Sequence, residues 1–524
     1  MAVSRKKVLW VDDEIEFLRA HILFLETRGY SVLPVFSGDD AVELIKNNPD
    51  AYDIVLLDEQ MPGKDGLTTL EEIKEIAPSM PVVMVTKSEE EELMEAALGR
   101  KIDGYLTKPV NPSQVLLVCK RLLDCNELIS NQLKQKFLRA YTDIRSVLAS
   151  TLKISDYFRL YESLCRWNVE LDKIEDEGLR QMHAGQISDC NTQFCNYVAE
   201  QYPRWIRGEG NGPLMATNVI EKVIAPMIEN KEKVLMIVLS GMRMDQLLNL
   251  ETELRTMFRI EKTSFCSVIP SEMKSSRSAL FTGKSPEQVY SDCPEIYRAE
   301  DEHIISESGK KLLCSGLKNL PISEEQIFYE EMTKNYSQEE ITEIIEQIEN
   351  ASIAVITIDI IKRFIQLSSS PNVLKEIASD EKALRSFTSS WFNSSSILKL
   401  LRTLSVENRN VIITSDHGHI LCSRGTEIYG TDLIEANLRY ICGEKISADE
   451  RQVIFLEEPS HYGLPKLSEN SRTIIARENY YFIYPDEFER FRDQYQNSFQ
   501  CGGISMDEMI MPLYVCKKRS HSGD

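Results

Sequence analysis

The sequence predicts an α/β protein with a five-stranded parallel sheet, a helical segment and a second, larger α/β domain. Apolar runs of strand length alternate with amphipathic runs through about residue 123, and these strand signals then stop. The alternation returns near residue 211 and continues to the end of the chain. We therefore expect three domains, at residues 1–123, 124–210 and 211–524.

The composition excludes several classes of protein. The 524 residues include 60 Lys and Arg against 82 Asp and Glu, a net charge of −22, which disfavours bulk attraction to nucleic acid or to an anionic membrane. No apolar run approaches the roughly 20 residues of a membrane span, and the first residues do not read as a signal peptide. The 12 cysteines contain no CxxC pair, which predicts reduced thiols in a cytoplasmic protein.

The first domain is expected to be a doubly wound sheet, because five strand–helix units follow one another. Strands are predicted at 7–11, 31–36, 53–57, 81–86 and 104–106, and helices at 14–28, 39–47, 67–76 and 89–98.

Chemically useful side chains stand where these strands end, at the edge where open α/β sheets bind ligands. Asp12 and Asp13 follow the first strand, Asp58 the third, Thr86 the fourth and Lys108 the fifth. Three converging carboxylates repel one another unless a cation lies between them, and Mg²⁺ suits such an all-oxygen site. Lysine and threonine can stabilise a phosphoryl group held there. An Asp-Asp pair alone would more often cap the next helix, but the whole set favours a phosphate-accepting site.

These residues, with Pro109 after the lysine, resemble a response-regulator receiver domain of flavodoxin-like fold. The resemblance implies that Asp58 accepts a phosphoryl group from a phosphohistidine of a sensor histidine kinase. It also implies that Mg²⁺ is bound by Asp12, Asp13, Asp58 and the backbone carbonyl of Gln60. Lys108 would contact the phosphoryl group, and Thr86 and Tyr105 stand where the family has its switch threonine and aromatic residue.

The middle segment is predicted to be a bundle of about three helices continuing from the last receiver helix. Apolar residues recur at three- and four-residue spacing over 126–152, 155–175 and 178–200, and Gly and Pro are sparse until residues 202–213. This segment could be a spacer, or a rigid relay or dimer interface between input and output. None of its residues indicates catalysis.

The last domain is predicted to contain strands at 233–239, 265–269, 326–329, 352–358, 410–414, 452–456 and 480–483. Asp416 and His417 follow one of these strands, Asp359 follows another, and the ligand pair of carboxylate and imidazole is one that zinc accepts. Ser271 precedes a predicted helix at 275–281 and could be a nucleophile or simply the helix N-cap.

The order of these motifs, with Arg243, Asp245, Arg277, Gly283 and the 499–505 stretch, resembles a PglZ domain of the alkaline phosphatase superfamily. A receiver, a helical bundle and a PglZ domain in this order resemble the PorX-type response regulators. That resemblance implies a link to type IX secretion and a zinc phosphodiesterase as output domain.

Four positions depart from the pattern that this family is expected to have. An aspartate, a threonine and two histidines are replaced here by Ser240, Ser271, Arg363 and Cys501. The first metal would keep Asp416 and His417, and the second would keep Asp359 with the Cys501 thiolate. A catalytic zinc site ordinarily has three good protein ligands, so zinc is doubtful and a degenerate site is expected.

We therefore predict a two-component response regulator in which phosphorylation of Asp58 changes protein association. Homodimerisation is the expected outcome, and a regulatory protein such as a sigma factor is an expected partner by family resemblance. The PglZ-like domain is expected to bind a ligand, held by an arginine such as Arg363, rather than to cleave it. The alternative is an active metal-dependent phosphodiesterase or phosphatase with Ser271 as nucleophile. Sequence-specific DNA binding lacks a basic face or a helix-turn-helix signal.

Overall fold

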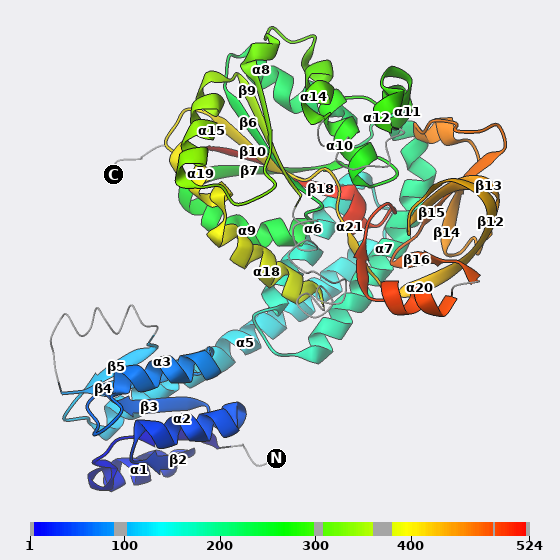
Figure 1. Ribbon diagram of the computed structural model, residues 1–524. Coiled ribbons are helices and arrows are strands. Elements are labelled where there is room, and N and C mark those ends of the chain that lie inside the picture. Colours follow the sequence, from blue (N-terminus) through cyan, green and yellow to red (C-terminus); the bar gives the residue numbers. More distant parts are fainter. Residues whose placement is uncertain (1–4, 88–101, 298–307, 360–379, 486–487, 520–524) are drawn as a thin grey trace. The chain divides into compact units, whose positions relative to one another are not determined.

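The computed structural model describes residues 5–87, 102–297, 308–359, 380–485 and 488–519 (Figure 1). It divides into two compact units, residues 1–138 and 139–524. The helix predicted at 89–98 and the candidate residue Arg363 lie outside the described residues.

The first unit confirms the predicted five-stranded parallel sheet, with strand order β2-β1-β3-β4-β5. Its strands are β1 (Lys6–Val11), β2 (Tyr30–Val35), β3 (Ile54–Asp58), β4 (Val82–Thr86) and β5 (Gly104–Thr107). Its helices are η1 (Ile15–Leu18), α1 (Arg19–Glu26), α2 (Gly38–Asn47), η2 (Pro49–Ala51), α3 (Gly66–Ile76) and α5 (Pro112–Leu148).

Both faces of this sheet are covered, which explains why its central strands are apolar throughout. Every residue of β3 is buried. Leu25 of α1 and Val115 of α5 pack on one face, and Ile45 of α2 and Leu70 of α3 pack on the other. The helix predicted at 14–28 is a 3₁₀ turn followed by α1.

Two long helices open the second unit, close to their predicted ranges: α6 (Ile154–Leu171) and α7 (Glu177–Ile206). The segment before them belongs to α5, which is one uninterrupted helix from Pro112 to Leu148, so the segment continues the last receiver helix as predicted. Buried side chains of α6 and α7, such as Tyr161 and Phe194, share a core with residues near the C-terminus, such as Met506 and Ile510. The helical segment is therefore packed into the second unit and does not stand apart from it.

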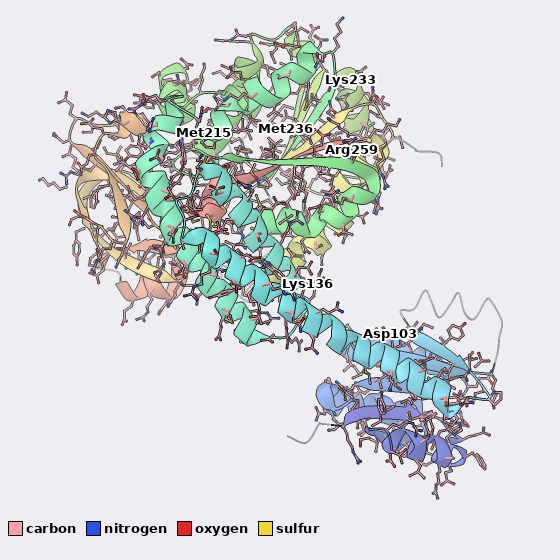
Figure 2. The ribbon with its side chains drawn as sticks, turned by 180° about the vertical axis from the view of Figure 1, so that it is seen from behind. Asp103, Lys136, Met215, Lys233, Met236 and Arg259 are labelled. Carbon is pink, nitrogen blue, oxygen red and sulfur yellow. The ribbon has the colours of Figure 1, made fainter. Side chains whose placement is uncertain are left out.

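The second unit has a central six-stranded mixed sheet of order β7-β18-β10-β6-β9-β8. The strands are β6 (Val234–Ser240), β7 (Phe258–Cys266), β8 (Ile327–Glu331), β9 (Ile353–Asp359), β10 (Asn410–Thr414) and β18 (Ile510–Lys518). Met236 of β6 lies within this sheet, away from Lys233 before the strand begins (Figure 2), and its side chain is fully buried.

Helices cover both faces of the central sheet, giving three layers. Leu235 and Ile237 of β6 face one helical layer, while Met236 and Val238 face the other. The first layer contains α9 (Met244–Met257), α15 (Gln338–Asn350), α18 (Glu381–Ser394) and α19 (Ser396–Leu404). The second contains η3 (Ala216–Asn218), η4 (Ile220–Ile224), α8 (Ala225–Glu229), α10 (Met273–Thr282), α11 (Pro286–Asp292) and α14 (Gly309–Leu317).

A separate five-stranded sheet, of order β14-β15-β13-β12-β16, follows β10. It is formed by β12 (Arg424–Ala436), β13 (Tyr440–Ala448), β14 (Val453–Leu456), β15 (Ser471–Ala476) and β16 (Tyr480–Ile483). The remaining described elements are α12 (Pro294–Tyr297), η5 (Glu324–Gln326), β11 (Ile420–Cys422), η6 (Pro459–Tyr462), α20 (Phe488–Tyr495), β17 (Ser498–Gln500) and α21 (Met506–Met509).

The strand predicted at 265–269 is wrong in its bounds, because β7 begins at Phe258 and ends at Cys266. Its first residues alternate between buried and exposed positions and include charged side chains, so they do not read as an apolar run. The strands β12, β13, β15 and β18 were not predicted. None of the described helices is long and apolar enough to cross a membrane.

Candidate functional site

The first unit brings three carboxylates together at the carboxyl edge of its sheet. Ligand oxygens of Asp12, Asp13 and Asp58 all lie within 4.8 Å of one another. The neighbouring parallel strands β1 and β3 are paired with Val11 opposite Leu57, which places the residues that end them side by side. Asp12 and Asp58 are buried, and Asp13 is exposed. The group therefore has one side open to solvent.

Lys108 lies between two of these carboxylates. Its Nζ is 2.8 Å from Oδ2 of Asp12 and 2.8 Å from Oδ2 of Asp58. Burial raises the pKa of Asp58, and the hydrogen bond and charge of Lys108 only partly oppose this. Burial alone would lower the pKa of Lys108, but its bonds to Asp12 and Asp58 raise it overall. Lys108 therefore stays charged. The ionised form of Asp58 beside it is destabilised by burial more than Lys108 stabilises it.

Thr86 makes an interaction that the sequence did not suggest. Thr86 Oγ1 at the end of β4 donates a hydrogen bond to the Glu59 carboxylate, directly after Asp58. The side chain of Tyr105 in β5 is about half exposed. The only sequence signal for this contact is the acidic residue that follows Asp58.

A cavity of about 610 Å³ opens beside this group. It is lined by Asp13, Glu59, Gln60, Met61, Pro62, Asp65 and Leu67. The backbone over Asp58 is tightly packed, since a Cβ on Gly66 would lie 2.3 Å from the carbonyl oxygen of Asp58. A small ligand can therefore approach the carboxylates from the cavity side.

The candidate site of the second unit is centred on Asp416, which is fully buried after β10. Ser240 Oγ lies 2.9 Å from both carboxylate oxygens of Asp416, and Arg277 Nε donates to its Oδ2 at 3.1 Å. His417 Nδ1 is 2.8 Å from its Oδ1. Both oxygens of Asp416 are thus occupied by side chains of the protein itself.

These contacts decide the charge of Asp416. Burial would raise the pKa of its carboxyl, but His417 and Arg277 hold that pKa well below its usual range. Burial would lower the pKa of His417, yet the charge of Asp416 and a contact with Cys501 raise it well above the usual value. Asp416 is therefore a carboxylate whose negative charge is already balanced.

Ser271 has a role that neither sequence interpretation covers. Its Oγ donates to the carbonyl oxygen of Gly503 at 2.7 Å, and the side chain is fully buried. The N-cap of α10 is Glu272, without a side-chain cap bond, so the N-cap interpretation of Ser271 is wrong. The hydroxyl instead joins the start of α10 to the segment 501–509.

The other predicted residues reach the same edge without forming a ligand group. Asp359 ends β9 directly opposite Ser240 in the parallel pairing of β6 and β9. Cys501 is partly exposed and interacts with His417. Within the described ranges, Asp12, Asp13 and Asp58 are the only three His, Cys, Asp or Glu side chains found close enough to share one ion.

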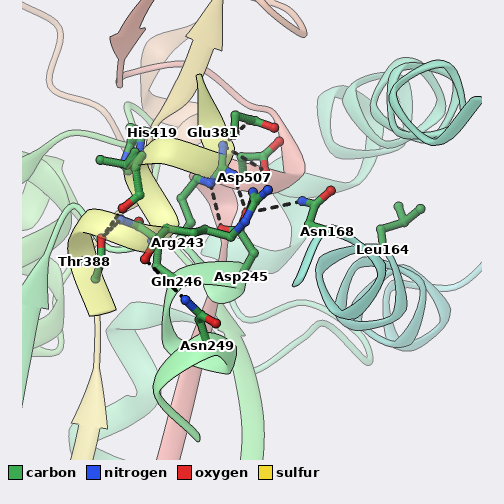
Figure 3. Close-up of polar contacts among 12 residues, drawn as sticks. Leu164, Asn168, Arg243, Asp245, Gln246, Asn249, Glu381, Thr388, His419 and Asp507 are labelled. Atoms are coloured by element: carbon green, nitrogen blue, oxygen red, sulfur yellow. Dashed lines mark hydrogen bonds and ion pairs between the residues drawn. The ribbon is translucent and has the colours of Figure 1, made fainter. Parts of the chain in front are cut away.

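A buried ionic network surrounds Arg243 and Asp245, which follow β6, and most of it was not predicted (Figure 3). Arg243 pairs with Asp245 and with Glu381, and lies 3.9 Å from Asp507. Arg385 joins Asp245 at 2.7 Å to Asp172, which follows α6, also at 2.7 Å. The sequence motifs named Arg243 and Asp245, but no local pattern signals partners more than a hundred residues away.

Comparison with known proteins assigns each part of the chain. The response regulator receiver domain matches residues 8–120, the PorX response regulator linker domain matches 127–206, and the BREX system PglZ alkaline phosphatase-like domain matches 219–515. The chain is a PorX-type response regulator. The resemblance predicted from the sequence is therefore confirmed, and residues 219–515 belong to the PglZ family.

Individual relatives are similar to part of this PorX-type regulator. The transcriptional regulatory protein ResD of Bacillus subtilis (strain 168) is 31% identical over 182 residues, which is 33% of this chain and 75% of that protein. The regulatory protein VanRc of Enterococcus gallinarum is 34% identical over 118 residues, 22% of this chain and 50% of that protein. A crystal structure of a CheY-like receiver domain from Methanospirillum hungatei JF-1 is 31% identical, covers 23% of this chain and 95% of that one, and has a TM-score of 0.22.

The receiver match indicates what kind of site the three carboxylates of the first unit form. The acidic triad Asp12, Asp13 and Asp58 is typical of a receiver Mg²⁺ site. A receiver domain also implies a histidine kinase as partner of this PorX-type regulator.

Proposed function

We propose that this protein is a two-component response regulator phosphorylated on Asp58 by a sensor histidine kinase, and that phosphorylation changes its association. The observation that best supports this proposal is the group of three carboxylates at one sheet edge. The Nζ atom of Lys108 lies 2.8 Å from a carboxylate oxygen of two of them. Hard oxygen ligands with one open side fit Mg²⁺. Asp12, Asp13, Asp58 and the carbonyl of Gln60 would hold the ion, which would neutralise phosphoryl oxygens when bound.

The transfer itself needs little of the protein beyond positioning and charge. A carboxylate oxygen of Asp58 forms the new bond to phosphorus, while the bond between phosphorus and the imidazole nitrogen of the kinase breaks. The kinase histidine leaves with the electron pair of that bond. Lys108 stabilises the charge on the transferred group, and Thr86 can donate to it after leaving the Glu59 carboxylate.

We further propose that the PglZ domain binds a phosphate-containing ligand or a protein rather than cleaving a phosphodiester. Both oxygens of Asp416 accept bonds from Ser240 or Arg277, and the described ligands do not gather into a group of three. A zinc ion would have to compete with the Arg277 guanidinium for Asp416. These residues fit a catalytic zinc poorly.

The alternative is a hydrolase with Ser271 as nucleophile. It is favoured by one observation, which is that several polar side chains gather at the carboxyl edge of the central sheet, where α/β folds bind ligands: Ser240, Ser271, Asp359, Asp416 and Cys501. Against it, the Ser271 hydroxyl donates to the backbone carbonyl oxygen of Gly503, which cannot act as a general base.

By its architecture we place the regulator in the cytoplasm, in control of type IX secretion, with a regulatory protein such as a sigma factor as output partner. The homodimer would use the receiver, since the acyl phosphate forms there. No direct contact with nucleic acid is proposed, because the net charge is −22.

The receiver proposal is tested with the full-length chain, a small acyl phosphate donor and Mg²⁺. We expect incorporation of phosphate and a shift toward dimer in analytical ultracentrifugation. Asp58→Asn should lose both, while Asp39→Asn, an exposed carboxylate at the start of α2, should lose neither. Equal dimerisation with and without donor would contradict the proposal.

The output proposal is tested by metal analysis and by hydrolysis of a nitrophenyl phosphodiester. We expect less than one zinc per chain and no turnover in the natural sequence. The variant Ser240→Asp/Arg363→His/Cys501→His, which restores the expected family ligands, should gain zinc. A pair of zinc ions in the natural chain, with turnover lost in Ser271→Ala, would establish the alternative.

A further inference from the structure

The linker helix α7 reaches the output site directly. Its buried face carries two amide side chains, Gln186 and Asn191, among apolar neighbours such as Phe194 and Val198. Both polar atoms of Asn191 and the Nε2 of Gln186 are hydrogen-bonded, while the Oε1 of Gln186 is buried without a hydrogen-bond partner among the described residues. The partners of these two residues lie at opposite ends of a chain of contacts.

Asn191 binds the segment 501–509, which precedes β18. Its Oδ1 accepts a hydrogen bond from the backbone N–H of Met506 at 2.8 Å, and its Nδ2 donates to Asp507 at 3.4 Å. One turn further along α7, the Cys195 thiol donates to the carbonyl of Ile504 at 3.6 Å. The short helix α21 lies beside α7 for this reason (Figure 1).

The same segment holds Ser271. The carbonyl of Gly503 accepts the Ser271 hydroxyl at 2.7 Å, and the N–H of Gly502 donates to the carbonyl of Ser271 at 3.0 Å. Glu508 fixes the other side of the loop, since its Oε1 accepts the N–H of Gly503 at 2.8 Å and its carboxylate pairs with Arg439. A displacement of residues 503–507 must therefore change the surroundings of Ser271.

Gln186 connects α7 to the incoming helix. Its Nε2 donates to the backbone carbonyl of Tyr141 in α5 at 2.9 Å, and α5 is a single helix from Pro112 to Leu148. Gln186 and Asn191 are five residues apart on α7, so both belong to one rigid stretch of helix. The contacts run from Tyr141 through Gln186 and Asn191 to Met506, and from there to Ser271.

We propose that Gln186 and Asn191 are positioning residues through which α7 sets the segment 501–509, and that this is how receiver phosphorylation controls ligand access at Ser271. The inference rests on the proposed phosphorylation of Asp58 and adds the route by which that signal reaches the output site. Neither side chain touches the ligand itself. Coupling of this kind requires a two-state element, which here is the position of residues 501–509 against α7.

The test is hydrogen–deuterium exchange of the peptide covering 501–509 in the full-length chain, with and without beryllofluoride and Mg²⁺ as an acyl phosphate mimic. We expect beryllofluoride to change its exchange rate in the natural sequence. In Asn191→Ala the basal exchange should rise roughly fivefold, as loss of one buried hydrogen bond gives, and the response to beryllofluoride should disappear. Gln193→Ala, exposed on the same helix, is the matched control and should behave like the natural sequence.

A double substitution separates the relay from a loss of folding. Asn191→Asp should repel the Asp507 carboxylate and weaken the response, whereas Asn191→Asp/Asp507→Asn restores a donor opposite an acceptor and should regain it. The comparison of Asn191→Asp with the double variant tests the role of Asn191 even if Asn191→Ala does not fold.

Three outcomes are distinguishable. Exchange of 501–509 that ignores beryllofluoride overturns the relay, whether or not the protein dimerises. A response that survives Asn191→Ala overturns the role of that residue. A response that needs Asn191 in a protein that does not dimerise upholds the relay and contradicts the proposed change in association.

Discussion

The regulator contains two clusters of ionisable side chains at the carboxyl edges of two sheets, and their charges are arranged in opposite ways. In the receiver, three carboxylates lie together and one lysine pairs with two of them, and burial leaves the pKa of Asp58 above its usual value. In the PglZ domain, one carboxylate is shared by Arg277, His417 and Ser240, and the pKa of Asp416 is held well below its usual range.

The difference shows what makes a sheet edge receptive to a cation. Carboxylates that lack sufficient positive partners stabilise an incoming dication or a transferred phosphoryl group with its ion. A carboxylate that already has a guanidinium partner would lose that pairing when it bound a metal. Two sites on similar folds can therefore differ in function through the number of basic side chains that surround each acid.

The largest expected effect tests the receiver side of the comparison. Asp58→Asn should reduce the incorporation of phosphoryl groups at least about a hundredfold, because an amide oxygen is a poor nucleophile and a poor Mg²⁺ ligand. Incorporation is measured with a labelled acyl phosphate donor. Residual labelling at the natural level would place the acceptor elsewhere.

The PglZ side is tested by Arg277→Ala. This change leaves the buried Asp416 without its guanidinium partner and should lower the free energy of unfolding by about 3–5 kcal/mol, measured with denaturant. The control is Arg255, whose exposed side chain pairs with the partly buried Glu251, and Arg255→Ala should cost less than about 1 kcal/mol. If both variants lower the free energy of unfolding by the same small amount, Arg277 does not balance the negative charge of Asp416.

A third buried carboxylate, Asp507, should give a pH-dependent effect. Burial raises its pKa from an ordinary 3.8 to about 6; Arg243 opposes the rise, while Glu381 and Asp245 add to it, and Tyr161 and Asn191 donate hydrogen bonds. Because the folded state then binds the proton more tightly than the unfolded state, this group is most favourable to folding below pH 3.8 and loses that contribution as the pH rises through 6.

The matching experiment compares Asp507→Asn with the natural sequence in denaturant titrations at several pH values. The stability of the variant relative to the natural protein should rise by about 2–2.5 kcal/mol between pH 4 and pH 7, out of the total of about 3 kcal/mol that the full shift gives at about 1.4 kcal/mol for each unit of pKa. A difference that is constant with pH would contradict a raised pKa for Asp507.

The smallest expected effect concerns the hydroxyl that contacts Asp416. Ser240→Ala removes one hydrogen bond to a charged group and should cost about 2 kcal/mol of unfolding free energy, less than Arg277→Ala. Ser240→Asp instead adds a second buried carboxylate and should destabilise the metal-free protein further. If zinc addition restored the stability of that variant, the difference between the two sites would depend on this single position.

Much of the receiver was predictable, since its information is local. Four of the five strands end at or just before a predicted site residue, so Asp12, Asp58, Thr86 and Lys108 follow from sequence position and sheet topology together. The contact between Glu59 and Thr86 did not follow, because it depends on side-chain rotamers of residues on different strands.

The PglZ domain was less predictable for two physical reasons. Strands such as β12 and β13 pair in an antiparallel sheet with polar residues on one face, so they lack continuous apolar runs. Arg385 and Asp507 form ion pairs with residues more than a hundred positions away, and such pairs have no periodic signature. The N-cap interpretation of Ser271 was wrong because a distant carbonyl, that of Gly503, takes its hydroxyl.

The core shared by α6, α7 and the C-terminal segment limits how this protein can be divided. Cutting the chain at residue 211 would expose Tyr161, Phe194 and Trp205 on one fragment and Met506 and Ile510 on the other. Such an output fragment should aggregate, whereas one beginning near residue 139 keeps its apolar surface covered. When such domains are recombined, the helical segment therefore has to be kept together with the PglZ domain. The receiver is the domain that can be exchanged.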